Sequence, residues 1–346
     1  MKWPMGGFAP FLTGVCVPVP KHVWEEKGWI GKKAISASNS PPEATPIGMG
    51  PFKFVEYVPG DHITFEAFDK FFAERPKIDV LYVKIFADME SALAAFKARE
   101  IDALHEVPAR VAPEIAKLPG AYVSVAEIPS YDSLYINQYP ENTTEGPNKG
   151  HPALRDLTVR KALAMAIDKE FLRDLLVPDW VVGYTPIPPF WPEFNPKVKD
   201  LWPKANLTEA AKILDEAGYV DTDGDGIRND PKSGRNLELR LLIYSPYPRL
   251  VRATDIIKGW LAQIGIRLDV KLGESWIWKV VVTPPYDWDL EFWGWTVHDP
   301  ISCWYVYTSD AVAAKWSSSG YHNPEFDELY KKLMEVETEE DYLAVQ

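Results

Sequence analysis

Two tryptophans near residue 295 are the side chains best suited to hold a small molecule. Trp293 and Trp295 close the run WDLEFWGW, which has the pattern of a β-strand. Alternate residues of a strand point to one face, so we expect both rings on the same face of a sheet. Such rings form flat walls in ligand clefts, although the same spacing suits a buried face of the core. His298 and Asp299 follow, and Asp299 either contacts a ligand or initiates a turn at Pro300.

A tyrosine and two arginines follow another predicted strand, which ends at Tyr244. They are Tyr247, Arg249 and Arg252. Ligands gather at the carboxyl ends of the strands in open α/β sheets. An arginine at this place could clamp a carboxylate, because its guanidinium is a planar fork of donors. The alternative is that Arg249 lies in the solvated first turn of a helix.

The segment Asp221–Asp230 carries acidic residues at alternating positions. Asp221, Asp223 and Asp225 occupy the first, third and fifth positions, and a glycine occupies the sixth, which suits a hard cation such as calcium. The twelfth position is Lys232, where a complete calcium loop has a glutamate. The sequence therefore leaves a calcium site and a surface β-turn open, and it predicts no other cofactor.

Acidic residues and tryptophans also occur together in carbohydrate hydrolases, which makes this enzyme class the main alternative to a binding protein. Such an enzyme needs two carboxylates that face each other across the scissile bond. Asp287, Asp289 and Glu291 instead share one face of one predicted strand, with a spacing that suits a solvated edge. The 6 histidines include no pair with metal-ligand spacing, and no nucleophile-elbow serine or phosphate-binding loop occurs. We therefore predict a protein that is not an enzyme.

The composition is that of an acidic globular protein. Hydrophobic residues make up 46% of the 346 residues and charged residues 25%. The 37 basic and 50 acidic residues give a net charge of −13, and no run of lysine and arginine occurs. This excludes the basic surface that nucleic-acid binding requires. No stretch has the length and hydrophobicity of a transmembrane helix.

The patterns in the first part of the chain predict mainly strands. Alternation on both sides of the turn Pro59–Asp61 predicts a hairpin. Further strands are predicted over 78–86, 121–128 and 133–139. Asp88 is suited to cap the N-terminus of a helix, and a second short helix is predicted over Ala112–Lys117.

The second part of the chain alternates helices and strands. Asp156 is expected to cap a helix over 157–176, and an amphipathic helix over Leu207–Ala217 ends at Gly218. A strand, a helix and a strand then follow over 237–243, 256–264 and 266–272. This spacing predicts a βαβ unit and therefore a parallel sheet.

A polar segment separates the two parts. Residues 139–150, YPENTTEGPNKG, are rich in proline and glycine and form the best boundary in the chain. We therefore predict one domain over 1–138, a hinge or linker over 139–150, and a second domain over 151–346.

Five blocks, in order along the chain, resemble the peptide/nickel class of ABC solute-binding proteins, called family 5. The blocks are IGMGPFKFVEY at 47–57, DLTVRKALAMAID at 156–168, AAKILDEAGY at 210–219, the segment 286–300 with its WGW and Asp-Pro, and YHNPEFD at 321–327. Each block is short, but together they span nearly the whole chain.

The resemblance implies an α/β fold of the type II periplasmic-binding-protein kind, with two lobes around a ligand cleft. Residues 1–138 would be part of lobe I and 151–346 would be lobe III. The protein would be an extracytoplasmic monomer, lipid-anchored in its full-length form, that delivers a small solute to an ABC permease. A chemoreceptor-docking sensor shares the fold and is a third class that the sequence does not separate from an importer component.

The resemblance also bears on the kind of solute. Peptide-binding members place an acidic side chain just after Gly-Trp, where it pairs with the peptide's amino group. His298 stands in that place here, and Asp299 is the candidate to replace the acid. Other members bind oligosaccharides against tryptophan rings, and the resemblance places tryptophans in or near blocks that face the cleft. These are Trp191, Trp276, Trp278, Trp293 and Trp295. A peptide and an oligosaccharide therefore both stay open as the solute.

Members of family 5 are longer than this chain. They begin with an export signal, an N-terminal strand and a middle domain, and they end with a segment that returns to the first domain. The resemblance therefore implies that the chain is a fragment without either end.

Overall fold

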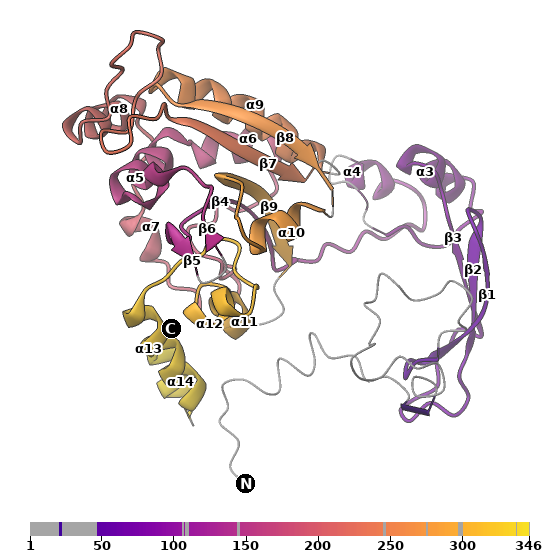
Figure 1. The fold of residues 1–346 in the computed structure, drawn as a ribbon. Coiled ribbons are helices and arrows are strands. Elements are labelled where there is room, and N and C mark those ends of the chain that lie inside the picture. Colours follow the sequence, from indigo (N-terminus) through magenta and orange to yellow (C-terminus); the bar gives the residue numbers. More distant parts are fainter. Residues whose placement is uncertain are drawn as a thin grey trace. The chain divides into compact units, whose positions relative to one another are not determined.

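The computed structural model describes most of the chain. It covers Lys21 and His22 and then residues 47–345, with gaps at 106, 108–110, 144–145, 245–246, 275, 297–299 and 337. The described residues form two compact units, one ending at Ala126 and the other beginning at Glu127. Each unit has sheet structure of its own (Figure 1).

The first unit is built on an antiparallel sheet with strands in the order β1-β2-β3. Its elements are β1 (Phe52–Val58), β2 (His62–Ala67), β3 (Val80–Lys84), α3 (Met89–Lys97) and α4 (Ala112–Ile115). The predicted hairpin is confirmed, because β1 pairs with β2 around a turn in which Gly60 has a φ of 77°. Asp88 caps α3 as predicted, since its carboxylate accepts a hydrogen bond of 2.8 Å from the amide of Ser91.

The end of the first unit differs from the sequence prediction. Alternation over 121–128 predicts a strand, but these residues form no strand in the structure. Tyr122 and Val125 are 86% and 87% exposed, and no strand among the described residues pairs with this segment. The prediction of a strand at 121–128 is therefore wrong.

The second unit is built on a four-stranded sheet in the order β4-β9-β7-β8. The strands are β4 (Ser130–Ile136), β7 (Glu238–Tyr244), β8 (Arg267–Gly273) and β9 (Leu290–Thr296). β7 runs parallel to β8 and β9, whereas β4 runs antiparallel to β9. The carboxyl ends of β7, β8 and β9 therefore meet the start of β4, and we call this side of the sheet the carboxyl edge. We call the opposite side, where β7, β8 and β9 begin, the amino edge.

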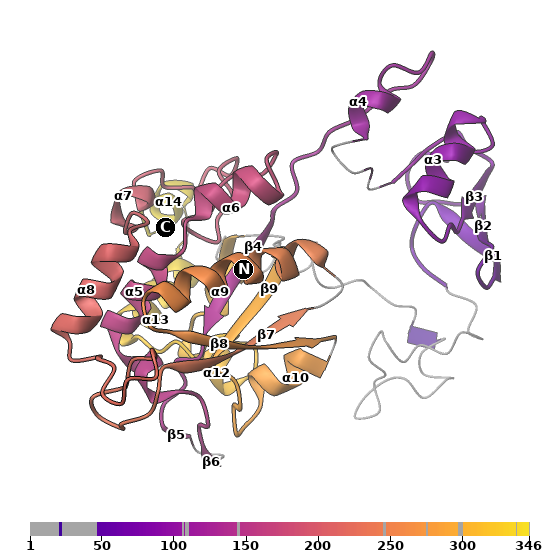
Figure 2. The same cartoon turned by 90° about the horizontal axis from the view of Figure 1, so that it is seen from above.

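Helices fill the stretches between these strands, and four more follow β9 in the described part of the chain (Figure 2). They are η2 (Pro152–Arg155), α5 (Leu157–Ala166), α6 (Lys169–Leu176), α7 (Val198–Leu201), α8 (Leu207–Glu216), α9 (Pro248–Gln263), α10 (Trp276–Val282), α11 (Pro300–Tyr305), α12 (Ser309–Ala313), α13 (Pro324–Glu335) and α14 (Glu339–Val345). The predicted βαβ unit is confirmed by β7, α9 and β8, although α9 begins earlier than its apolar stripe indicates.

The sheet separates two hydrophobic cores. Leu239, Leu241 and Ile243 of β7 lie in the larger core, together with side chains of α5, α8 and α9. Leu242, which points to the other face, lies in a second core with side chains of α10. Burial on both faces explains why β7 reads as a nearly continuous apolar run, and it makes this sheet the rigid part of the unit.

The helix predicted over 157–176 is two helices. α5 ends at Ala166, and Ile167 has an extended conformation with φ −104° and ψ 110°. Asp168 then caps α6, because its carboxylate accepts a hydrogen bond of 2.9 Å from the amide of Phe171. The apolar periodicity continues across this break, so periodicity alone predicts a single helix incorrectly.

The polar segment 139–150 lies within the second unit. It contains the short strands β5 (Asn142–Thr143) and β6 (Gly146–Pro147), and Asn148 donates a hydrogen bond of 2.8 Å to the carbonyl of Tyr139. β4 precedes this segment and pairs with β9 along its whole length. The division into compact units therefore falls before β4 and not at 139–150. The assignment of the two parts to lobes I and III stays a prediction.

Candidate functional site

An aromatic cluster forms at the carboxyl edge of the second sheet. Tyr244 ends β7, Tyr247 precedes α9, and Arg249 lies in the first turn of that helix. The centroid of the Tyr244 ring is 5.1 Å from that of Tyr247 and 4.5 Å from that of Trp293 on β9. Tyr247, Arg249 and Trp293 thus meet where the parallel strands end, as the sequence predicts.

Arg249 is held by a carboxylate that the sequence patterns did not single out. Its Nε and Nη2 donate hydrogen bonds of 2.6 and 2.9 Å to the two carboxylate oxygens of Asp132 on β4. The guanidinium carbon is 4.4 Å from the ring centroid of Tyr247 and 5.2 Å from that of Trp180. Nη1 has no hydrogen-bond partner among the described residues. The guanidinium is therefore fixed, while one of its nitrogens keeps its donors available.

Asp132 could have been found from the sequence, because it breaks the pattern of β4. Leu134 and Ile136 share its face of the strand and pack against the larger core. Asp132 therefore puts a charge at the start of an otherwise apolar face. Its partner on β9 is Gly294, where an added Cβ would lie 2.6 Å from Asp132 Oδ1. The glycine between the two tryptophans thus leaves room for the carboxylate that holds Arg249.

Trp295 lies half-buried against a second tryptophan. Its ring centroid is 5.4 Å from that of Trp278, with the ring planes at 81°. The ring of Trp278 in turn lies 6.2 Å from that of Trp316, which is 55% exposed. The indole Nε1 of Trp295 is buried without a hydrogen-bond partner. Buried indole nitrogens usually have a partner, so this donor is an exception among the described residues.

Trp276 and Trp191 lie beside this edge through other neighbours. Trp276 begins α10 and is 47% exposed, and its ring packs so closely on Gly273 that an added Cβ there would lie 2.4 Å from it. Trp191 packs against the small core of Ile187 and Cys303, as does Tyr131, the residue of β4 that pairs with Trp295. His298 and Asp299 lie outside the described residues, so the roles of Asp299 in ligand binding and in a turn both stay predictions.

Two of the three acidic residues in the segment 287–291 are buried. Asp289 is 1% exposed and Glu291 is not exposed, so the predicted solvated edge is wrong for both. Asp289 accepts hydrogen bonds of 2.8 Å from the amide and from Nε of Arg240, and one of 2.6 Å from the amide of His151. Its carboxylate therefore joins β7, β9 and the segment before η2. This is a structural role and not that of one of two opposed catalytic acids.

Neither carboxylate oxygen of Glu291 has a hydrogen-bond partner among the residues that the structure describes. It lies in the middle of the sheet, opposite Tyr135 of β4 and Leu242 of β7. Burial raises the pKa of its carboxyl group to about 8, because the charged form loses its hydration there. Glu291 is therefore mainly neutral at pH 7.

A serine, a histidine and an aspartate meet near the end of the chain. Ser309 Oγ donates a hydrogen bond of 2.6 Å to Asp327 and also contacts the Nδ1 atom of His322. In a hydrolytic triad the histidine lies between the serine and the acid, whereas here the serine lies between the other two. The amide of Ser309 also donates to Asp327, at 2.9 Å. The group therefore connects α12 to α13 and does not support a hydrolase.

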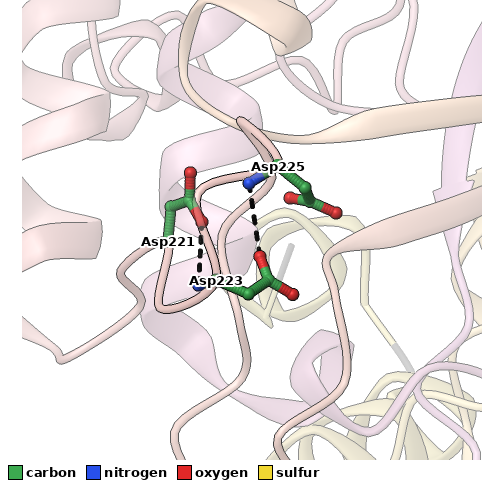
Figure 3. A group of neighbouring side chains, drawn as sticks. All are labelled: Asp221, Asp223 and Asp225. Atoms are coloured by element: carbon green, nitrogen blue, oxygen red, sulfur yellow. Dashed lines mark hydrogen bonds between the residues drawn. The ribbon is translucent and has the colours of Figure 1, made fainter.

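The three aspartates of the candidate calcium loop lie close together at the surface (Figure 3). One carboxylate oxygen from each residue lies within 4.8 Å of the other two. The two oxygens of Asp221 accept hydrogen bonds of 2.7 and 2.9 Å from the amides of Gly224 and Gly226, which lower the pKa of this carboxyl group. Asp223 accepts from the amide of Asp225 at 3.3 Å. These bonds explain the turn without a cation, while the oxygens themselves are of the kind that calcium binds.

A hollow of about 290 Å³ lies along β4. It is lined by Ser133, Leu134, Tyr135, Ile136, Gln138, Tyr307, Ser319 and Tyr321. No residue that the sequence predicts to bind ligand lines this hollow. The chemistry of the aromatic cluster, and not this hollow, therefore defines the candidate site.

The sequence matches the family described as bacterial extracellular solute-binding proteins, family 5, middle region, over residues 2–315. The chain belongs to this family. The resemblance carried by the five sequence blocks is thereby confirmed. No helix in the described part of this family 5 chain is long and apolar enough to span a membrane.

Relatives of known structure share its fold. The oligopeptide-binding protein AppA of Bacillus subtilis is 28% identical over 351 residues, which cover 99% of this chain and 60% of AppA. The structure of AppA with a nonapeptide matches 94% of this chain and 62% of that one, with a TM-score of 0.68 and 26% identity. The periplasmic oligopeptide-binding protein of Thermotoga maritima with bound mannohexaose gives a TM-score of 0.69 at 22% identity, covering 94% of this chain and 61% of that one.

These likenesses confirm the predicted α/β fold of the type II periplasmic-binding-protein kind. The chain spans about three fifths of the length of these relatives.

Proposed function

We propose that this chain forms part of the extracytoplasmic solute-binding component of an ABC importer. It captures a peptide or an oligosaccharide and delivers it to a permease in the membrane. The observation that carries this proposal is the aromatic cluster at the carboxyl edge, in which Asp132 fixes Arg249 and leaves Nη1 without a partner. A fixed donor between half-exposed rings has the mixture of apolar wall and convergent polar group that ligand sites use.

The proposal assigns a role to each predicted residue. Trp293 and Trp295 form the apolar wall, Tyr247 extends it, and Arg249 donates hydrogen bonds to the solute. Trp191 and Trp276 extend the wall further, while His298 and Asp299 make polar contacts beyond β9. The same proposal makes the protein a monomer without catalytic activity, held outside the cytoplasm by a lipid anchor.

A ligand screen by thermal unfolding of the full-length protein tests this function. A solute at a hundred times its dissociation constant stabilises the protein by about 2.7 kcal/mol, and we expect at least one peptide or oligosaccharide to do so. The solute should be recovered intact after incubation, because the protein does not hydrolyse it. If no member of either library raises the unfolding temperature, or if the solute is cleaved, the proposed function is wrong.

A further inference from the structure

The charge of Arg249 is balanced within the cluster. Its Nε and Nη2 donate to both carboxylate oxygens of Asp132, at 2.6 and 2.9 Å, so the pair carries no net charge. The side chains of Arg249 and Asp132 are 31% and 16% exposed, so the pair is partly accessible. Nη1 has no partner in the described part of the chain, and carboxylate oxygens keep lone pairs beyond the two bonds they accept. The pair therefore offers a donor and an acceptor side by side.

This pairing favours one kind of ligand group over two others. A carboxylate that approaches Nη1 is repelled by Asp132, and an ammonium that approaches Asp132 is repelled by Arg249. A hydroxyl group both donates and accepts a hydrogen bond, so it can use both members of the pair at once. An uncharged ligand with several hydroxyl groups thus matches the pair better than a peptide terminus does.

The rings around the pair favour the same kind of ligand. Tyr247 and Trp180, which lie against the guanidinium, are 38% and 40% exposed, and Trp276 at the same edge is 47% exposed. Exposed aromatic rings that gather at one place mark a binding surface more often than an inert one. Sugar rings present apolar C–H faces as well as hydroxyl edges, and the two surfaces match flat rings and a donor–acceptor pair respectively.

We infer that the solute is a neutral oligosaccharide, with Arg249 and Asp132 acting together as an uncharged anchor for its hydroxyl groups. The inference rests on the proposed function and selects one of its two solute classes. It also gives Asp132 a part in specificity, because this residue determines that the anchor is neutral.

Calorimetric titration of the full-length protein tests the inference. The probes are neutral hexaoses of mannose, of β-1,4- and α-1,4-linked glucose and of xylose, and an uncharged-side-chain nonapeptide with free termini. We expect a hexaose to bind with an affinity that does not change with ionic strength, since no net charge is paired on binding. Arg249→Lys and Asp132→Asn should each weaken that binding by about tenfold or more.

Arg267→Lys is the matched control, because Arg267 pairs with Glu238 at the amino edge of the same sheet. It should bind the hexaose as the unchanged protein does. Should Asp132→Asn fail to fold, Arg249→Lys and the salt series still decide the question.

The outcomes separate the inference from the proposed function. If the nonapeptide binds tightly, with an affinity that falls as salt rises, and no hexaose binds, the inference of an oligosaccharide solute is wrong. The proposed solute-binding function then still stands. If a hexaose binds and neither variant weakens that binding, the role of Arg249 and Asp132 as the anchor is wrong. If neither the hexaoses nor the peptide binds, the inference fails, and the peptide and oligosaccharide libraries then decide whether the proposed function fails with it.

Discussion

The two edges of the second sheet each carry an arginine paired with an aspartate, but the pairs are built differently. At the amino edge, Arg240 donates to Asp289 and Asp287 and to the carbonyl of Lys149, so Nε, Nη1 and Nη2 all have acceptors. At the carboxyl edge, Arg249 uses Nε and Nη2 on Asp132 and leaves Nη1 without a partner in the described chain.

The difference shows how a structural pair can be told from a binding pair. Asp289 raises the pKa of the Arg240 guanidinium above its ordinary value, because both its hydrogen bonds and its charge favour the protonated form. Each guanidinium nitrogen of Arg240 has an acceptor within the fold, and each carboxylate oxygen of Asp289 accepts two hydrogen bonds. The pair at the carboxyl edge is held by two hydrogen bonds, yet Nη1 of Arg249 has no acceptor among the described residues and its donors can bind an added molecule. Incomplete hydrogen bonding of a well-positioned group is therefore the better indication of a site.

The largest expected effect comes from breaking the Arg240–Asp289 pair at the amino edge. Asp289→Ala should lower the free energy of unfolding by roughly 3–5 kcal/mol, because it leaves the buried part of Arg240 and the amide of His151 without an acceptor. Urea unfolding monitored by circular dichroism measures the loss. Asp132→Ala is the matched change at the other edge and should cost clearly less stability, because its pair is more exposed. Equal losses for the two variants would contradict the distinction between the edges.

Glu291, between the two edges, should make stability depend on pH. Its folded-state pKa of about 8 lies above the ordinary value of 4.5, so the folded state holds a proton that the unfolded state has released. Stability from this group is complete below pH 4.5 and is lost as pH rises toward 8, with a slope of up to about 1.4 kcal/mol per pH unit. Glu291→Gln should remove this slope. Denaturant unfolding of both proteins from pH 5 to 9 measures it, and parallel curves would show that Glu291 does not titrate in this range.

A substitution at Trp295 tests whether this ring at the carboxyl edge binds solute or stabilises the hydrophobic core. We expect Trp295→Ala to weaken solute binding by about 1–3 kcal/mol, because a wall of the site is lost. The free protein should unfold at nearly the same temperature, since the ring is only half-buried. Thermal melts with and without solute measure both quantities. A loss of roughly 3–5 kcal/mol of stability in the free protein would instead place the ring among the core residues.

Local patterns predict the elements of this molecule better than its long-range pairs. The alternation over 237–243 and 266–272 is enough to predict β7 and β8. Asp88 and Asp156 mark the starts of helices, because capping acts within three residues. Periodicity fails where a cap interrupts it, as at Asp168, and where no described strand pairs with the segment, as at 121–128.

The candidate site could be predicted only in part for the same reason. Tyr247, Arg249 and Trp293 are found because they follow or end predicted strands. Asp132 lies 117 residues before Arg249, and only the pairing of β4 with β9 brings the two together. Glu291 was expected at a solvated edge, because a pattern of alternate acids does not show that both faces of β9 are covered.

The smallest expected effect concerns the aspartate loop, which precedes β7 at the amino edge. Of the six carboxylate oxygens of Asp221, Asp223 and Asp225, five accept a hydrogen bond from the loop itself or from Asn236, and only Asp223 Oδ2 does not. A cation would have to share or replace these bonds. The comparison of the two edges indicates that a group whose hydrogen bonds are already made within the fold has a structural role. We therefore expect added calcium to leave the unfolding temperature unchanged, whereas Asp221→Ala should lower it slightly. A chelator-reversible rise in the unfolding temperature with calcium, absent in Asp221→Ala, would instead establish a calcium site.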